Sequence, residues 1–116
     1  MKKSRRTQKI ASVIKKNLGR IISKEISNPR MGLVTVTDVD VAMDLSIAKV
    51  YFTIIGGEMK HKNQVNTIKN LDKFLRKRLS DKIELKHTPQ IRMIYDETPR
   101  KAQRVEKIIK KIKQER

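Results

Sequence analysis

The chain has 116 residues, of which 29 are Lys or Arg and 12 are Asp or Glu, so its formal net charge is +17. This length fits one domain with one core. The absence of cysteine excludes disulfides, thiolate zinc sites and thiol nucleophiles, and no apolar run approaches the roughly 20 residues that span a bilayer. We therefore expect a cytoplasmic protein whose partner is a polyanion, with nucleic acid favoured over an anionic membrane surface.

The positive charge is unevenly distributed along the chain. Residues 1–30 hold ten Lys or Arg and one acidic residue, whereas residues 31–55 hold one Lys and three acidic residues. Residues 56–98 hold ten Lys or Arg and six acidic residues, and residues 99–116 hold eight Lys or Arg and two acidic residues. The central, slightly acidic segment carries Asp38, Asp40 and Asp44. We expect these carboxylates to repel phosphate and so to confine a nucleic acid to the helical side of the molecule.

The first predicted element is a helix from about Ser4 to Ile26. Its apolar residues are spaced by three and four, as on one face of a helix: Ile10, Val13, Ile14, Leu18, Ile21, Ile22 and Ile26. Pro29 and Gly32 in "SNPRMG" then end the helix.

A hairpin of two strands is predicted from Leu33 to Ile54, with "AMDL" as its turn and Gly56-Gly57 closing it. The apolar parity changes between Val36 and Val39, which predicts a bulge or bend near Asp38. We expect four side chains of this hairpin to pack under the helices: Val34, Val36, Val50 and Phe52.

A second helical region is predicted from about Lys62 to Leu79, with an apolar stripe of Val65, Ile68, Leu71, Leu75 and Leu79. The opposite side carries four cations that we name the basic ridge: Lys69, Lys73, Arg76 and Lys77. After Pro89, the alternation of Ile91, Met93 and Tyr95 predicts a third strand.

Thr98-Pro99 is typical of a helix start, which gives a basic helix over residues 99–116 after a domain over residues 1–98. This helix would belong to the same single domain or be partly mobile. Its apolar stripe would either dock on the domain, or the segment would stay mobile until RNA orders it.

The order helix, two strands, a helical pair and a strand predicts an α+β protein with a three-stranded sheet covered by helices, as in the type II KH fold. Two stretches, "ISNPRMGLVTVTDVDVAMDLSIAKVYFTI" and "TPQIRMIYDETPRKAQRVEKII", resemble the ribosome-binding factor A family, bacterial assembly factors of the small ribosomal subunit. The resemblance covers nearly the whole chain. It is strongest at Asn28-Pro29-Arg30, Asp44-Leu45, Ala48-Lys49-Val50-Tyr51, Pro89, Ile91 and Tyr95-Asp96.

The resemblance implies a type II KH-like domain that binds rRNA without the Gly-x-x-Gly loop of most KH domains. No two of the four glycines stand three apart in this chain. The family replaces that loop by a helix, a kink marked Ala-x-Gly and a second helix. Here Leu71-Asp72-Lys73 stands at that place, which departs from the pattern.

Nine cations are candidate RNA contacts, through phosphate rather than bases: Arg5, Arg6, Lys9, Arg30, Lys69, Lys73, Arg76, Lys77 and Arg78. For the basic ridge, the alternative is a merely solvated helix face. For Arg5, Arg6 and Lys9 it is a frayed, solubilising tail, and for Arg30 a local hydrogen bond to carbonyls of the preceding helix. Tyr51 and Tyr95 are either stacking platforms or, as we favour, residues packed beneath a terminal helix.

We expect neither catalysis nor a cofactor or metal. No histidine accompanies the hairpin carboxylates, and His61 and His87 lack ligands at metal spacing, so we interpret both as surface or loop residues. The resemblance implies a monomeric, non-catalytic assembly factor that binds the immature small subunit and its rRNA late in maturation, affects rRNA processing and growth in the cold, and is released by a partner GTPase. The alternatives are a nonspecific nucleic-acid or nucleoid-type binder and a structural ribosomal protein.

Overall fold

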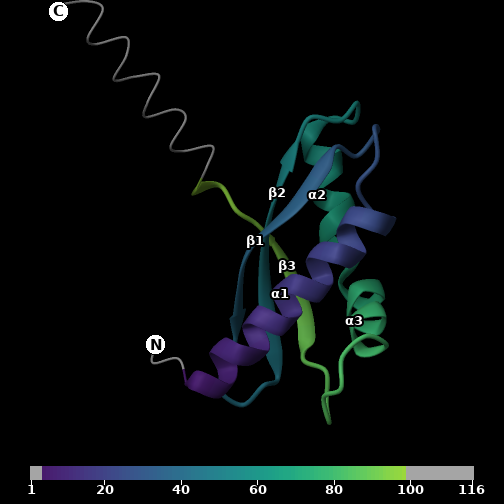
Figure 1. Ribbon diagram of the computed structural model, residues 1–116. Coiled ribbons are helices and arrows are strands. Elements are labelled where there is room, and N and C mark those ends of the chain that lie inside the picture. Colours follow the sequence, from purple (N-terminus) through teal and green to yellow (C-terminus); the bar gives the residue numbers. More distant parts are fainter. Residues whose placement is uncertain (1–3, 99–116) are drawn as a thin grey trace, which may run out of the picture.

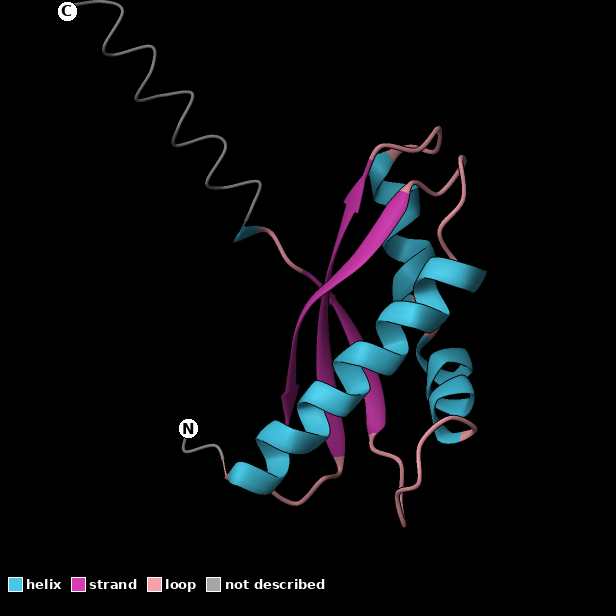
Figure 2. Ribbon diagram, in the orientation of Figure 1, coloured by secondary structure: helices cyan, strands magenta, loops and turns pink. Residues whose placement is uncertain are grey.

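The computed structural model describes residues 4–98, so the predicted helix over residues 99–116 lies outside the described residues. The described residues form three helices and three strands in the order α1 (Arg5–Glu25), β1 (Leu33–Val41), β2 (Ile47–Ile55), α2 (His61–Lys69), α3 (Asp72–Ser80) and β3 (Gln90–Tyr95). All three helices lie on one face of the sheet (Figures 1 and 2). This is the predicted α+β architecture, and it is consistent with a type II KH-like fold.

Helix α1 begins where the sequence predicts. The backbone N–H of Thr7 donates to the hydroxyl of Ser4 at 3.1 Å, which satisfies one of the free donors of the first turn. Ile14, Leu18 and Ile22 are fully or almost fully buried, so the predicted apolar face is the core face. Val13 is the exception. It is 41% exposed, because it lies at the border of that face rather than within it.

The sheet has the order β1-β2-β3, with β1 and β2 antiparallel and β3 parallel to β2. The register between β1 and β2 shifts between Val36 and Asp38, which confirms the predicted bulge. Because of this shift, apolar side chains from both halves of β1 reach the core. The four hairpin residues expected under the helices are all buried: Val34, Val36, Val50 and Phe52.

The hairpin turn is formed by "AMDL", in which the N–H of Leu45 donates to the carbonyl of Ala42 at 2.9 Å. Gly56 and Gly57, which follow β2, are not part of this turn. They lie at the open end of the hairpin, against Gly32. A Cβ on Gly32 would stand 2.6 Å from the carbonyl oxygen of Gly56, and the φ of Gly32 is +87°. Only glycine therefore fits the close approach of the two chain segments. The amide of Gln64 in α2 closes this end by donating to the carbonyls of Met31 at 2.9 Å and Gly56 at 2.8 Å.

The predicted second helical region consists of two helices, in agreement with the helical pair of the predicted fold. Leu71, between α2 and α3, has φ −94° and ψ 10°, so the helical path is interrupted there without a glycine. The Asp72 carboxylate, in the first turn of α3, accepts a hydrogen bond from the backbone N–H of Met93 in β3 at 3.1 Å. Docking onto the sheet thus fixes the break that the resemblance implied, although the Ala-x-Gly residues are missing.

Candidate nucleic-acid interface

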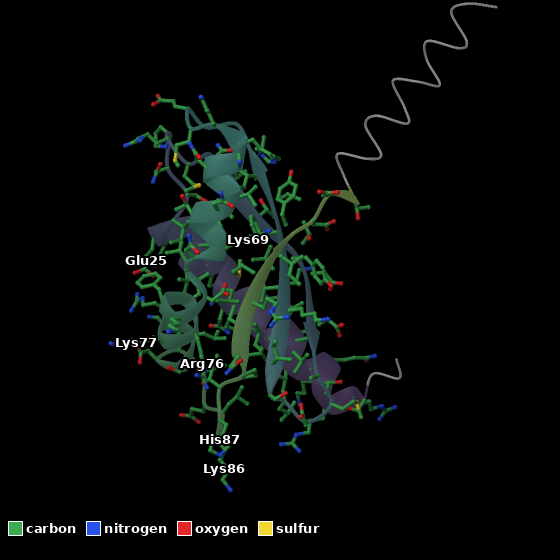
Figure 3. The ribbon with its side chains drawn as sticks, turned by 180° about the vertical axis from the view of Figure 1, so that it is seen from behind. Glu25, Lys69, Arg76, Lys77, Lys86 and His87 are labelled. Atoms are coloured by element: carbon green, nitrogen blue, oxygen red, sulfur yellow. The ribbon has the colours of Figure 1, made fainter. Side chains whose placement is uncertain are left out.

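The exposed side of α3 carries most of the basic ridge. Lys73, Arg76 and Lys77 are exposed, whereas Leu75 and Leu79 are fully buried. The break at Leu71 assigns Lys69 to the end of α2, so the ridge runs over two helices (Figure 3). The three α3 cations therefore form one local group, and Lys69 lies on the neighbouring helix.

A hollow lies between α3 and the loop of residues 81–89, and we name it the α3 hollow. Its lining consists of Lys73, Arg76, Lys77, Ser80, Lys86, His87 and Thr88. The guanidinium of Arg76 donates from Nε and Nη2 to the carbonyl of Thr88, at 3.2 and 2.9 Å. This bond ties the loop to the helix, so that Lys86 and His87 lie on the same side of the molecule as Arg76 (Figure 3).

Three of the basic residues near α3 were not among the predicted contacts: Lys86, His87 and Arg92. Lys86 and His87 line the α3 hollow, and Arg92 lines an adjacent hollow that shares Lys73 and Arg76. Two basic residues in a short loop were a weak signal in the sequence, because periodicity gives no direction to loop side chains. The bond between Arg76 and Thr88, which the sequence does not reveal, brings the far part of that loop to the helix.

One carboxylate, that of Asp72, lies beside these cations. Its partial burial raises the pKa, although the hydrogen bond from Met93 and the charge of Arg92 oppose the rise. The positive end of the α3 helix dipole also stabilises a negative charge at this N-terminal position. Asp72 therefore serves the helix break at some electrostatic cost, and it weakens the local positive field.

Arg78 is engaged elsewhere. Its Nη2 lies 2.9 Å from Oε1 of Glu25, and its Nε donates to Oε2 of the same carboxylate at 3.0 Å. This two-point contact joins α3 to the end of α1. Of the nine predicted contacts, Arg78 is thus the one whose charge is directly neutralised within the described part of the chain.

The remaining predicted contacts are not gathered with the ridge. Arg5, Arg6 and Lys9 are exposed on the first turns of α1, which is about 30 Å long, whereas Glu25 and its partner Arg78 lie at the other end. Arg30 follows Pro29 in the turn after α1. There the Asn28 side chain, not that of Arg30, donates to a helix carbonyl, that of Ile26. The exposed Arg30 guanidinium has no partner among residues 4–98.

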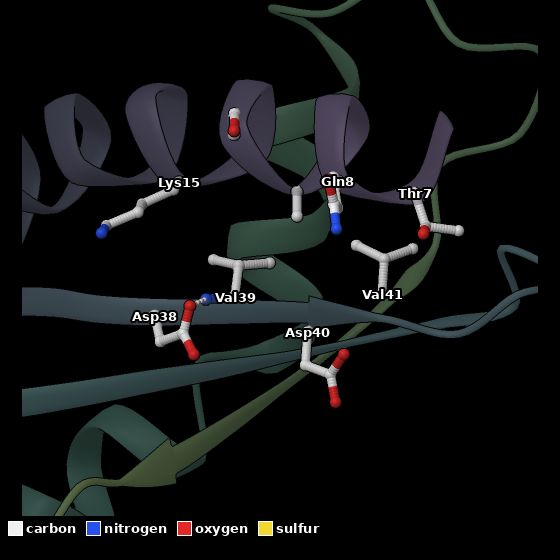
Figure 4. A pocket seen from close by; sticks show the side chains of 9 residues that line it. Thr7, Gln8, Lys15, Asp38, Val39, Asp40 and Val41 are labelled. Atoms are coloured by element: carbon white, nitrogen blue, oxygen red, sulfur yellow. Dashed lines mark hydrogen bonds between the residues drawn. The ribbon is translucent and has the colours of Figure 1, made fainter. Parts of the chain in front are cut away.

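None of the three hairpin aspartates lines the α3 hollow. Asp38 and Asp40 line a polar pocket between β1 and the first half of α1, together with Gln8 and Lys15 (Figure 4). Asp38 accepts a hydrogen bond from the N–H of Val39 at 2.9 Å. In the turn, the hydroxyl and the backbone N–H of Ser46 both donate to the Asp44 carboxylate. These hydrogen bonds lower the pKa of Asp44, and the bond from the hydroxyl has the larger effect. These carboxylates are built into the bulge and the turn, as predicted.

The histidines differ in their surroundings. His61 begins α2 and packs edge-on against Tyr95, with ring centroids 4.9 Å apart, so it is not a simple surface residue. His87 is exposed in the loop, as predicted. Within the described residues, no three His, Cys, Asp or Glu side chains could hold a metal ion together. No helix in that part of the chain is long and apolar enough to cross a bilayer.

Comparisons with known proteins bear on the whole chain. The family model described as Ribosome-binding factor A matches residues 6–109. The Ribosome-binding factor A of Pelobacter propionicus is 36% identical over 109 residues, covering 94% of this chain and 89% of that protein. That of Halothermothrix orenii is 31% identical over 113 residues, covering 97% and 93%.

Solved structures agree with the fold. Ribosome-binding factor A from Thermus thermophilus superposes with a TM-score of 0.65 at 18% identity, covering 77% of this chain and 93% of that one. A homology model of the Thermus thermophilus factor, fitted into a cryo-EM map of its 30S complex, gives a TM-score of 0.63 at 17% identity, covering 75% of this chain and 91% of that one. Since the family model matches most of the chain and the relatives exceed 30% identity over nearly all of it, the chain belongs to the ribosome-binding factor A family.

Proposed function

We propose that this chain is a non-catalytic factor that binds the small ribosomal subunit, with the α3 hollow seated on rRNA phosphates. The observation that carries the proposal is the set of four basic residues converging on this hollow from α3 and the loop: Lys73, Arg76, Lys77 and Lys86. Within the described residues none of them has a carboxylate partner. Support also comes from the 30S complex of the Thermus thermophilus factor.

Phosphate recognition fits the chemistry of the hollow better than base reading. Lysine and arginine donors bind phosphate oxygens and position a protein on RNA, whereas base reading in single strands relies on stacking against aromatic rings. His87 is the one residue of the hollow's lining with a ring. The protein would then recognise the shape of the rRNA backbone rather than its sequence.

The factor would act on maturation because its affinities for the immature and the mature particle differ. A protein that binds the immature particle more tightly than the mature one shifts the rRNA toward the bound conformation and leaves when that conformation is lost. We place this action in the cytoplasm, in late maturation, with the protein as a monomer. Effects on rRNA processing and on growth in the cold, and release by a partner GTPase, belong to the same proposal.

The test is cosedimentation with small subunits, large subunits and intact ribosomes over a salt series. Lys73→Gln with Lys77→Gln removes two charges from the α3 hollow, and Lys60→Gln with Lys62→Gln removes two from the exposed start of α2 as a matched control. We expect retention on small subunits alone at the higher salt, and about tenfold weaker binding for the α3 variant only.

Three results would contradict the proposal. Equal loss of the wild type from every particle as salt rises would mean that the net charge alone explains binding, and a nonspecific nucleic-acid binder would replace the assembly factor. Equal affinity of the α3 variant and its control would exclude the hollow from the interface. Stoichiometric presence on translating ribosomes would instead indicate a structural ribosomal protein.

A further inference from the structure

A second basic surface lies on the outward side of α1, and we name it the α1 groove. It is a shallow groove lined by Ser12, Lys15, Lys16, Gly19, Arg20, Ser23 and Lys24. These positions recur at helical spacing on the side opposite the buried Ile14 and Leu18. Neither Glu25, through which α1 holds Arg78, nor any residue of the α3 hollow belongs to this lining.

The charges of the groove are costly for the isolated helix. Lys16, Arg20 and Lys24 follow one another at intervals of four residues, so like charges are neighbours along the helix and destabilise it. None of these three side chains has a hydrogen bond or ion pair within the described residues. Lys24, in the last turn, also complements the negative end of the helix dipole. Lys16 and Arg20 lack this compensation, and an anionic ligand would neutralise their repulsion.

Gly19 adds a second cost that the fold does not require. A Cβ at this position would meet no atom within 4 Å, and its φ is not in the left-handed region. Alanine would therefore fit, and glycine in a helix interior is less favourable than alanine. Without a side chain at Gly19, the floor between Lys16 and Arg20 stays low, which lets a phosphate group approach both cations.

We infer that the α1 groove binds a second stretch of rRNA sugar-phosphate backbone, apart from the stretch in the α3 hollow; this inference rests on the proposed function. The lining contains no aromatic ring, so it would contact backbone and not bases. It also lacks the Trp, Phe and Leu anchors of helices that lie in a membrane surface. RNA is thus the polyanion that fits the groove.

Binding to purified small subunits over a salt series tests this inference with two variants. Lys16→Gln with Arg20→Gln removes two rim charges. We expect binding about tenfold weaker at physiological salt, and a slope of log K against log salt that is smaller by about 1.5. Gly19→Gln leaves the charge unchanged and has a better helix propensity than glycine. We expect weaker binding with an unchanged or higher melting temperature.

The controls separate this inference from the proposed function. The Lys60→Gln, Lys62→Gln variant matches the loss of charge at a place outside both surfaces. If the wild type shows no preference for small subunits, the proposed function fails and the inference with it. If the α3 variant loses affinity while both α1 variants match the control, the α1 groove alone is refuted. If the two α1 variants lose binding to vesicles of phosphatidylglycerol while their binding to small subunits is unchanged, the RNA inference is refuted and the groove binds a membrane surface instead.

Discussion

Gln64 makes a buried polar contact at the open end of the hairpin. It is 3% exposed, and its amide donates to the carbonyls of Met31 and Gly56, which precede and follow the hairpin. We expect Gln64→Leu, which keeps the approximate size and removes both donors, to destabilise the fold without changing its surface charge. The change therefore tests whether one amide holds α2 against the open end of the sheet.

The magnitude follows from the two carbonyls. Met31 is 6% exposed, so its unpaired carbonyl would cost about 1–3 kcal/mol, while Gly56 is exposed and its carbonyl would lose only about 0.5–1.5 kcal/mol as water replaces the amide. Burial of the leucine offsets part of this cost. We expect a loss of about 2–3 kcal/mol, which for a domain of this size lowers the melting temperature by roughly 10–20 °C.

Urea unfolding followed by circular dichroism measures this loss. The matched control is Gln8→Leu, because Gln8 is exposed and its side chain has no hydrogen bond within residues 4–98. We expect the control to change the free energy of unfolding by less than about 0.5 kcal/mol. A Gln64→Leu protein as stable as the control would show that the two bonds contribute nothing net, and the account of the hairpin end would be wrong.

Three further predictions concern the hairpin end and the charges around α3. Gly32→Ala should cost at least about 1 kcal/mol more than Gly56→Ala in urea unfolding, because both have positive φ but only a Cβ at Gly32 meets backbone atoms; equal costs would contradict this. Burial raises the pKa of Asp72, so the stability from this group is present below its unfolded pKa and is lost as pH rises through its folded pKa. Unfolding over a pH series should therefore show the wild type losing stability relative to Asp72→Asn as pH rises from about 3 to about 7, and that variant should bind small subunits more tightly; a flat difference would refute the assignment. Glu25→Gln should lower stability by no more than about 0.5 kcal/mol, since the ion pair is about one-third exposed, and should strengthen subunit binding by freeing Arg78; weaker binding in the same sedimentation assay would contradict it.

Local patterns along the chain were enough to predict the elements and their buried faces. Spacing by three and four set the extent of α1, and Ser4 marked its start. The change of parity between Val36 and Val39 placed the bulge correctly, because a strand that keeps both sets buried must shift its register. The basic surface of α3 was likewise visible, since a helix face depends only on spacing along the chain.

Contacts between distant segments could not be predicted in this way, because they depend on how the elements pack. The break before α3 depends on Asp72 meeting Met93, and the α3 hollow depends on Arg76 reaching Thr88. The engagement of Arg78 depends on Glu25, which lies 53 positions earlier in the chain. Periodicity tells which side of an element is buried but not which elements meet. It therefore predicted which cations are exposed, while packing decided which of them stand together and which are neutralised.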